Sequence, residues 1–245
     1  MTERVARLSY FFPAHNEEAN LRGLVEEALE TLPSLAATFE IVIVDDGSRD
    51  DTPGIADELA AAHERVRAVH HASNLGYGAA IRSGFAAARY SNIAFTDGDR
   101  QFKVADLGRL IERLRAGDVD AVVGYRIRRA DPLVRTVYAR AYRLANRIFF
   151  GLRVRDVDCA CKLFSRASLE GVNVESGGAF LSAELLIKLR ARGVRMAQVG
   201  VNHFPRAAGT NTGASFTKIL RTFRDLAKLR WDLWTKRDEV LGRRG

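Results

Sequence analysis

Two carboxylates, Asp97 and Asp99, are the pair in this sequence whose spacing best suits chemistry. They flank Gly98, which allows a tight turn, and they follow the apolar run 92–96. Two hard oxygen ligands at this spacing can hold a divalent cation, and such a cation neutralises a diphosphate. The same tripeptide also forms ordinary turns, so a purely structural role is the alternative.

A second acidic turn, 45–48, reads Asp-Asp-Gly-Ser and follows the β-branched run 39–44. Such a turn often caps a helix, and its carboxylates can also accept hydrogen bonds from a base or a ribose. Two further polar segments accompany it: 12–18 reads Phe-Pro-Ala-His-Asn-Glu-Glu, and 74–80 reads Asn-Leu-Gly-Tyr-Gly-Ala-Ala. These segments indicate a binding site more strongly together than any one of them does alone.

The elements that must position these residues alternate along the first half of the chain. Apolar runs predict strands at 8–13, 39–44, 66–70, 92–96 and 120–124. Helical periodicity predicts helices at 17–32, 52–63, 77–89 and 104–116. This order is typical of an α/β fold with a doubly wound, mostly parallel sheet, where ligands bind beyond the carboxyl ends of the strands. The acidic segments fall at such ends, so spacing alone predicts a nucleotide-binding α/β enzyme.

The second half of the chain has a different rhythm. Helices are predicted at 132–151, 180–192 and 216–236, with an edge strand at 194–201 and a Gly/Asn/Thr-rich loop at 207–214. The last helix is basic and amphipathic and carries Trp at its border, as do helices that lie in anionic membrane interfaces. Packing of its apolar stripe on the core or on a second subunit is the alternative.

The composition excludes several classes of protein. With 245 residues, 47% hydrophobic, the chain can bury a sizeable core and is not disordered. Two cysteines, Cys159 and Cys161, are too few for a disulfide scaffold or a zinc site, and they predict buried small side chains in a reducing compartment. No run is long enough to span a bilayer, and no signal peptide is evident, so we expect a cytoplasmic protein, peripheral on a membrane face.

The net charge of +8 is unevenly distributed, with −7 over residues 1–120 and +15 over residues 121–245. An acidic half joined to a basic half predicts metal or nucleotide handling in the first and an anionic partner for the second. A nucleic-acid-binding module would also explain the charge. It would not explain carboxylates at three strand ends, and no helix-turn-helix, RNA-recognition or zinc pattern is present.

The order and spacing of these segments resemble the family 2 inverting glycosyltransferases, which have a GT-A fold. The subgroup that they resemble is the polyprenyl-phosphate (dolichyl-phosphate) mannose and glucose synthases, over about residues 8–212. The resemblance implies transfer of a hexose from a GDP- or UDP-sugar to a polyprenyl phosphate, dependent on Mn²⁺ or Mg²⁺. A soluble hydroxyl acceptor and a nucleotidyltransferase, which releases pyrophosphate, are the alternatives.

The resemblance also implies roles for particular residues. Those implied to contact the donor nucleotide are Pro13, His15, Glu17, Asp46, Asp97 and Gln101. Asp97 and Asp99 would hold the metal and, with Arg126, form the catalytic group. The residues implied for the acceptor phosphate are Arg126, Arg135, Lys162 and Arg206. A phosphate acceptor is already ionised near neutral pH, whereas a hydroxyl acceptor needs a base, for which Glu184 and Asp156 are the candidates.

The resemblance divides the chain into a glycosyltransferase domain, 1–215, and a basic amphipathic helix and tail, 216–245. Within the domain, 1–124 would bind the nucleotide sugar and 125–215 the acceptor. One departure from the family pattern is Arg100, which we expect to place an additional cation beside the metal site. A homo-oligomer is compatible with this pattern.

Overall fold

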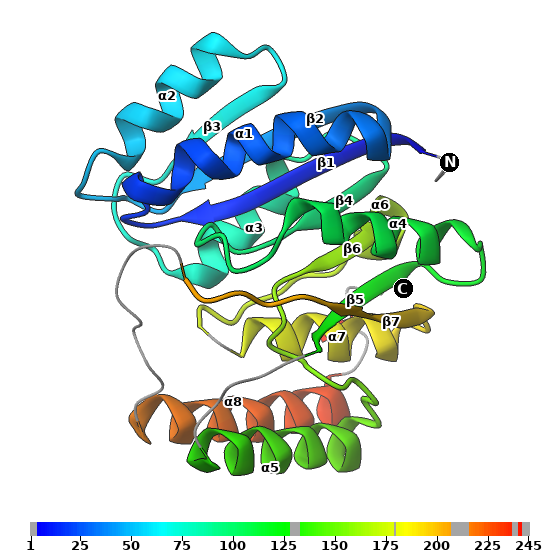
Figure 1. The fold of residues 1–245 in the computed structure, drawn as a ribbon. Helices are drawn as coiled ribbons and strands as arrows, with labels where there is room; N and C mark the ends of the chain where they lie inside the picture. The colour runs from blue at the N-terminus through cyan, green and yellow to red at the C-terminus, as the bar shows by residue number, and fades with distance from the viewer. Residues whose placement is uncertain (1–3, 128–132, 179, 207–215, 237–239, 242–245) are drawn as a thin grey trace.

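The fold is a seven-stranded sheet flanked by helices, seen here in a computed structural model (Figure 1). The structure describes residues 4–127, 133–178, 180–206, 216–236 and 240–241, with only the backbone for 133–139, 216–221 and 223. The strands are β1 (Val5–Ala14), β2 (Ala36–Asp45), β3 (Val66–His70), β4 (Asn92–Phe95), β5 (Ala121–Arg126), β6 (Lys162–Ser165) and β7 (Met196–Val201). Their order is β3-β2-β1-β4-β6-β5-β7, and every pairing is parallel except those of β6.

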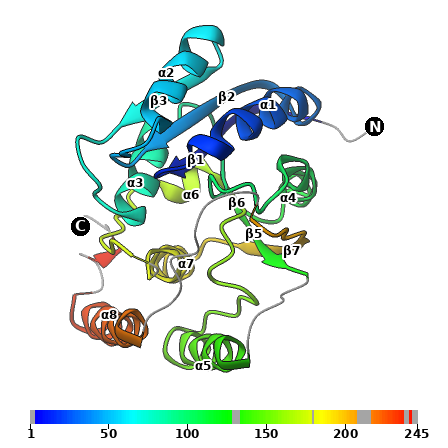
Figure 2. The same ribbon diagram turned by 60° about the vertical axis from the view of Figure 1, so that its left-hand side comes forward.

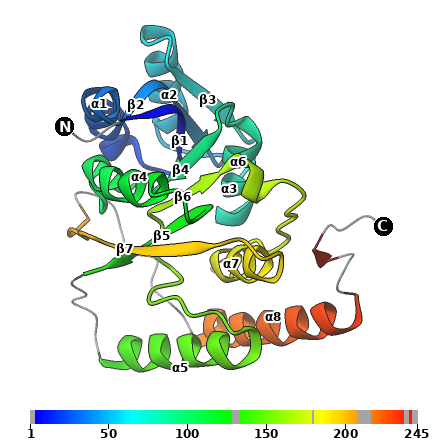
Figure 3. The same cartoon turned by 90° about the vertical axis from the view of Figure 1, so that its right-hand side faces the viewer.

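Helices cover both faces of the sheet. They are α1 (Glu18–Leu35), α2 (Thr52–Ala62), α3 (Tyr77–Ala87), α4 (Leu107–Arg115), α5 (Leu133–Phe150), α6 (Arg166–Leu169), α7 (Leu181–Ala191) and α8 (Phe216–Thr235), with a 3₁₀ turn η1 (Val104–Asp106). Helices α5 and α8 lie together at the end of the molecule opposite α2, and α7 lies between them and the sheet (Figures 2 and 3). The predicted α/β fold with a mostly parallel sheet is therefore confirmed.

The centre of the sheet is apolar on both faces, as expected for a strand covered by helices on each side. Phe11 and Phe12 of β1 are fully buried, and the Phe11 ring stacks on Phe95 of β4 at 5.3 Å between centroids. Helix α3 approaches this cluster closely because position 84 is Gly, where a Cβ would lie 2.1 Å from the Phe11 ring. Close packing of this kind fixes the strand ends that carry the acidic segments.

Among the strands in the described part of the chain, β6 is the one that sequence patterning did not predict. Its four residues are too short to show a period, and it enters the sheet antiparallel between β4 and β5, with Lys162 opposite both Phe95 and Val123. The proposed boundary between 124 and 125 falls inside β5, so the two halves share one sheet. Among the residues that the structure describes, no helix is long and apolar enough to cross a bilayer.

Candidate functional site

One edge of the sheet collects most of the residues expected to act. The parallel strands β1, β2, β4 and β5 all end there, and β6 begins there because it runs the opposite way. Ala14 pairs with Asp45, and Phe95 pairs with Lys162. The loops that follow β1, β2 and β4 and the loop that precedes β6 therefore lie next to one another at this edge. Segments far apart in the sequence therefore meet at this edge, as the alternating pattern predicts.

Asp97 and Asp99 lie in the turn that follows β4. The Tyr77 hydroxyl donates a hydrogen bond to Asp97 Oδ1 at 3.0 Å, and the Gln101 amide donates to Asp99 Oδ1 at 3.1 Å. Burial, with the negative charge of Asp99 as the second cause, raises the pKa of Asp97 to about 6. Two crowded carboxylates of this kind favour a nearby positive charge.

The chemistry of this pair fits a hard divalent cation, because carboxylate oxygens are the ligands that such cations take. No group of three or more His, Cys, Asp or Glu side chains within the described ranges is arranged to hold a metal. Asp97 and Asp99 could supply two of the oxygen ligands of such a cation. Tyr77, at the start of α3, was not predicted to act, although it stands inside the Asn-Leu-Gly-Tyr-Gly segment.

Arg206 reaches this pair from the loop that follows β7. Its Nη2 donates to Asp99 Oδ2 at 2.8 Å, and its Nη1 lies 3.9 Å from Glu17 Oε1. Two hydrogen bonds hold the loop on the Asp97–Gln101 turn: the Phe204 amide donates to the Gln101 carbonyl at 2.9 Å, and Gln101 Nε2 donates to the Phe204 carbonyl at 3.1 Å. The residue expected at the acceptor phosphate thus already pairs with one of the two carboxylates expected to hold the metal.

Asp46 anchors the loop that leads into α3. Its buried carboxylate accepts hydrogen bonds from His71 Nδ1 at 2.7 Å and from the amides of Leu75 and Gly76, both at 2.9 Å. Gly76 has a φ of 91°, in the left-handed region that glycine adopts without strain. Asp46 therefore shapes this edge through the loop, and its contact with a nucleotide base stays a prediction.

His15 and Glu17 extend from the end of β1 beside Asp46. His15 Nδ1 lies 3.1 Å from the Asp46 carbonyl, which can only accept, so Nδ1 carries the proton. His15 Nε2 is then an acceptor, at 2.9 Å from Asn74 Nδ2. Burial raises the pKa of Glu17, although the hydrogen bond from Asn20 opposes the shift. Pro13 precedes these residues, and its carbonyl lies against Gly98, where a Cβ would be only 2.6 Å away.

Arg126 and Asp156 form a buried, two-pronged ion pair. Arg126 Nε donates to Asp156 Oδ2 at 2.6 Å and Nη2 donates to Oδ1 at 2.9 Å. Burial disfavours the guanidinium charge, but the hydrogen bonds to Asp156 outweigh it and raise the pKa of Arg126. A carboxylate held by both prongs is a poor proton acceptor, so the suggestion that Asp156 acts as a general base does not fit this geometry.

Lys162 does not fit the role suggested for it at the acceptor phosphate. The side chain is fully buried, and its Nζ donates to the Cys159 carbonyl and to Ser182 Oγ. Burial lowers the pKa of Lys162, and the ammonium faces the Phe95 ring with 5.5 Å between Nζ and the centroid. An ammonium with no exposed surface has no face to offer a phosphate.

Glu184 is also built into the interior. Its carboxylate accepts hydrogen bonds from the amides of Glu175 at 3.0 Å and Ser176 at 2.8 Å, and it lies 2.7 Å from Lys188 Nζ. Burial alone would raise the pKa of Glu184, but the hydrogen bonds, led by Lys188, lower it. A well-satisfied carboxylate with a lowered pKa is unsuited to general-base catalysis, so its suggested role as a base is not supported.

Replacing Glu184 by glutamine is expected to lower the free energy of unfolding by about 3 kcal/mol, because the buried Lys188 charge loses its partner. Urea denaturation measures this loss, with the exposed Glu112→Gln on α4 as the matched control. Unchanged stability together with a loss of the acidic limb of the pH–rate profile, which reports a catalytic base, would instead restore Glu184 as the base.

Other expectations have simple outcomes. Arg100 has a φ of 59°, and its guanidinium packs against Gly23 of α1, where a Cβ would lie 2.4 Å from Nη1. The Arg100 guanidinium, expected beside the metal site, therefore points toward α1.

Cys159 and Cys161 are buried and free, as predicted. Arg135 lies on α5, but its side chain is outside the described residues.

Comparison with known proteins agrees with this arrangement. Residues 9–172 match Glycosyl transferase family 2. The glycosyltransferase AglD of Haloferax volcanii is 37% identical over 207 residues, which cover 81% of this chain and 33% of that protein. The polyprenol monophosphomannose synthase of Mycolicibacterium smegmatis is 29% identical, with 84% of this chain and 80% of that protein covered. The chain thus spans only about a third of the length of AglD.

Solved structures share the fold. The glucosyl-3-phosphoglycerate synthase of Mycobacterium tuberculosis, crystallised with Mn²⁺, UDP-glucose and phosphoglyceric acid, superposes with a TM-score of 0.73 at 18% identity. That comparison covers 92% of this chain and 80% of the other. The matched segment contains residues 13–17, 45–48 and 97–101, which lie at one edge of the sheet. The chain belongs to glycosyl transferase family 2.

Proposed function

We propose that this chain transfers a hexose from a nucleoside-diphosphate sugar to a polyprenyl phosphate, with a divalent cation and with inversion at the anomeric carbon. The observation that carries the proposal is the meeting of Asp97, Asp99, Glu17 and Arg206 at one sheet edge, beside the Asp46-anchored loop. In this arrangement, the carboxylates that would bind a cation lie next to a guanidinium that would bind a phosphate. Both groups would then act on the bond between the sugar and the diphosphate.

The divalent cation, Mn²⁺ or Mg²⁺, would be held by Asp97 and Asp99 together with the donor diphosphate. When bound, it supplies charge stabilisation to the departing diphosphate. The structure fits this role because Asp97 and Asp99 offer carboxylate oxygens at one turn, where burial and the charge of Asp99 raise the pKa of Asp97. The glucosyl-3-phosphoglycerate synthase of Mycobacterium tuberculosis, which shares this fold, has been crystallised with Mn²⁺ and UDP-glucose and with Mg²⁺ and UDP, which supports the proposal.

In the proposed reaction, an acceptor phosphate oxygen attacks the anomeric carbon as the bond from that carbon to the diphosphate oxygen breaks. The bonding pair leaves with the nucleoside diphosphate. An ionised phosphate needs no general base. The candidate bases support this acceptor over a hydroxyl, because Asp156 is held by Arg126 and Glu184 by Lys188 and two amides.

Arg206 is the residue we expect to meet the acceptor phosphate. The Arg206 guanidinium already donates a hydrogen bond to a carboxylate oxygen of Asp99. Phosphate oxygens accept hydrogen bonds from a guanidinium in the same way. Arg126 already bonds Asp156 through Nε and Nη2, and the acceptor roles of Arg126 and Arg135 stay predictions. A dolichyl-phosphate beta-glucosyltransferase, ALG5D of Trichomonas vaginalis, is 29% identical over 94% of this chain and 76% of that protein, which supports a lipid-phosphate acceptor.

We propose that the chain meets this acceptor on the cytoplasmic face of a membrane through α8.

Isothermal titration with UDP, GDP and dTDP, each with and without Mn²⁺, tests the donor half. We expect metal-dependent binding of one nucleotide, which also identifies the base. Incubation of that sugar nucleotide with a polyprenyl phosphate should then release the nucleoside diphosphate. Release of pyrophosphate from a nucleoside triphosphate mixed with a sugar phosphate would favour a nucleotidyltransferase instead, and no binding of any nucleotide would contradict the proposal.

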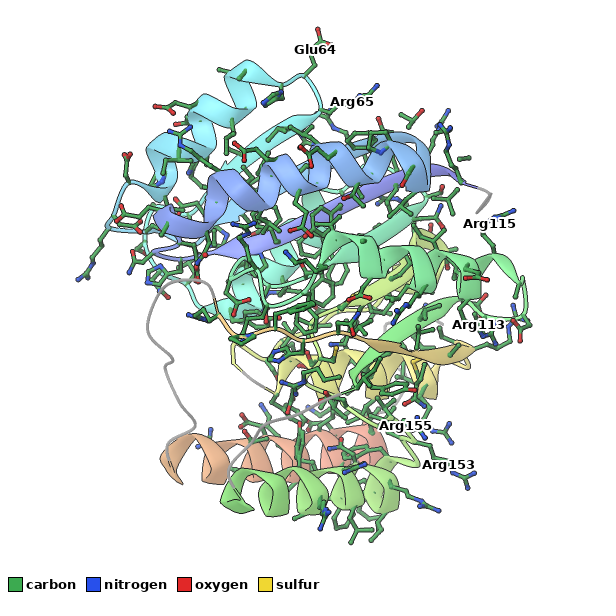
Figure 4. The ribbon with its side chains drawn as sticks, viewed as in Figure 1. Glu64, Arg65, Arg113, Arg115, Arg153 and Arg155 are labelled. Atoms are coloured by element: carbon green, nitrogen blue, oxygen red, sulfur yellow. The ribbon has the colours of Figure 1, made fainter. Side chains whose placement is uncertain are left out.

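Replacing Arg206 by alanine is expected to raise the KM for the acceptor at least tenfold while nucleotide binding with Mn²⁺ is retained, because removal of the guanidinium frees Asp99 for the cation. Steady-state kinetics and titration measure the two effects separately. The exposed Arg153, which projects from the segment after α5 (Figure 4), provides the control variant Arg153→Ala. Equal losses of acceptor and donor affinity would argue against the assignment.

A further inference from the structure

Exposed apolar side chains gather on two helices. Of the large hydrophobic residues that are exposed within the described part of the chain, most lie on α5 and α8: Leu144, Ile148, Phe149, Trp231 and Trp234. The two tryptophan rings contact each other at 5.4 Å between centroids. The helices lie side by side at one end of the molecule (Figures 1 and 2). An apolar patch of this kind on a surface indicates a binding function.

A cavity of about 610 Å³ opens between these two helices and α7. Its lining comprises Phe149, Phe150, Ile187, Arg190, Ala191, Arg230, Leu233 and Trp234. Phe149 and Trp234 are 52% and 70% exposed, so the mouth of the cavity is itself part of the apolar patch. The volume is within the range of small-molecule sites, which run from about 300 to 1,000 Å³.

The cavity carries positive charge. Arg190 is fixed at its wall, because its Nε donates to the Phe150 carbonyl at 3.2 Å, and Arg230 is exposed on α8. Outside the cavity lining, α5 carries Arg140, Arg143 and Arg147 and no acidic residue from residue 140 to its end. Aromatic walls with guanidinium groups suit a ligand that has both a hydrocarbon chain and an anionic head.

This cavity is separate from the catalytic edge. Helix α5 begins soon after Arg126, and Phe149 lies sixteen residues beyond the first residue of the helix, Leu133. At a rise of 1.5 Å per residue, this spacing amounts to about 24 Å along the axis. The cavity therefore lies near the end of α5 that is remote from its first residue, and its lining contains none of the residues expected to bind the reacting phosphate.

We propose that the cavity binds an anionic lipid of a bilayer, with its acyl chain among Phe149, Leu233 and Trp234 and its headgroup on Arg190 and Arg230. A second copy of this chain fits less well, because a symmetric contact would bring two arginine-rich faces together. A bilayer with anionic lipids offers both the apolar interior and the opposite charge. The inference deepens the membrane contact in the proposed function and does not depend on catalysis.

Tryptophan fluorescence tests the site directly, because Trp231 and Trp234 are the only tryptophans in the sequence. The variant Trp231→Phe leaves Trp234 as the sole reporter at the cavity mouth. Vesicles of phosphatidylcholine with 30 mol% phosphatidylglycerol brominated on its acyl chains should quench Trp234. Vesicles of phosphatidylcholine with the same bromination should not. Equal quenching by both, or by neither, would overturn the proposal.

Two further variants examine charge and cavity separately. Arg230→Gln should weaken binding to the anionic vesicles about fivefold, which corresponds to about 1 kcal/mol for one basic residue at a membrane surface. Arg4→Gln removes the same charge from an exposed position just before β1 and should leave binding unchanged. Equal losses in the two variants would show attraction by net charge alone and would overturn the assignment to Arg230.

Ala191→Phe fills the cavity without changing charge or the exposed apolar face. It should reduce the quenching of Trp234 at saturating anionic vesicles, with nucleoside diphosphate release unchanged. Full quenching in this variant would place the lipid outside the cavity and overturn the proposal. Light scattering without lipid measures the oligomeric state of the chain. A dimer that is lost on Trp234→Ala would assign the surface to a second copy of the chain. Failure of these tests would leave the proposed glycosyl transfer standing.

Discussion

Replacing Asp99 by alanine is expected to lower turnover by about a thousandfold or more. The substitution removes one of the two carboxylates proposed to hold the cation, and charge stabilisation by such a cation is worth several kcal/mol in the transition state. It also leaves Arg206 without the carboxylate that its Nη2 contacts at 2.8 Å. Cation affinity and the position of the acceptor loop should therefore change together.

The measurement is nucleoside diphosphate release at several Mn²⁺ concentrations, from limiting to saturating. Asp118→Ala is the matched control, because Asp118 is an exposed carboxylate paired with Arg113 at the far end of α4 (Figure 4). Circular dichroism should show both variants folded. Turnover retained by Asp99→Ala at saturating metal would contradict the role of Asp99 as a metal ligand.

Acidification is expected to weaken Mn²⁺ binding about tenfold per pH unit below pH 6, or about a hundredfold at pH 4. Burial and the charge of Asp99 raise the pKa of Asp97 to about 6, and the protonated carboxyl is a poor ligand. Because the folded pKa is raised, Asp97 contributes stability below its usual value of 3.8 and loses that contribution as pH rises through 6. Loss of binding in acid is therefore not caused by unfolding through Asp97.

Titration of Mn²⁺ across pH 4–8, with tryptophan fluorescence as a check on folding, measures the effect. Tyr77→Phe sharpens the test, because the Tyr77 hydroxyl donates to Asp97 Oδ1 and its hydrogen bond lowers the pKa. Its loss should move the midpoint to higher pH. A Mn²⁺ affinity that is constant between pH 7 and pH 4 would show that Asp97 does not bind the cation.

Local patterning in the sequence predicts much of the sheet and the place of the site. The β-branched run 39–44 lies within β2, and the acidic turn 45–48 begins at its end. The polarity periods of strands and helices depend on residues that are neighbours in the sequence. Both could therefore be predicted without knowledge of contacts between distant segments. The predicted helix at 104–116 is observed as a 3₁₀ turn followed by α4, a difference confined to the helix start.

Partners of charged side chains could not be predicted in the same way. Glu184, Asp156 and Lys162 have residue types suited to catalysis or phosphate binding, yet each is buried against a partner in the fold. Whether a carboxylate is a base or an anchor depends on burial and on hydrogen bonds from distant segments. Neither quantity is visible in the local sequence.

The sequence by itself determined the α/β class and the strand ends that hold Asp46, Asp97 and Asp99, since these depend on local period and turn chemistry. The tertiary structure alone decided that β6 enters the sheet antiparallel and that Arg206, 107 residues beyond Asp99 in the sequence, bonds its carboxylate. It also decided that residues of α5, α7 and α8 line an open cavity. Contacts between distant segments form only when burial of the whole core compensates for the entropy of closing the chain between them.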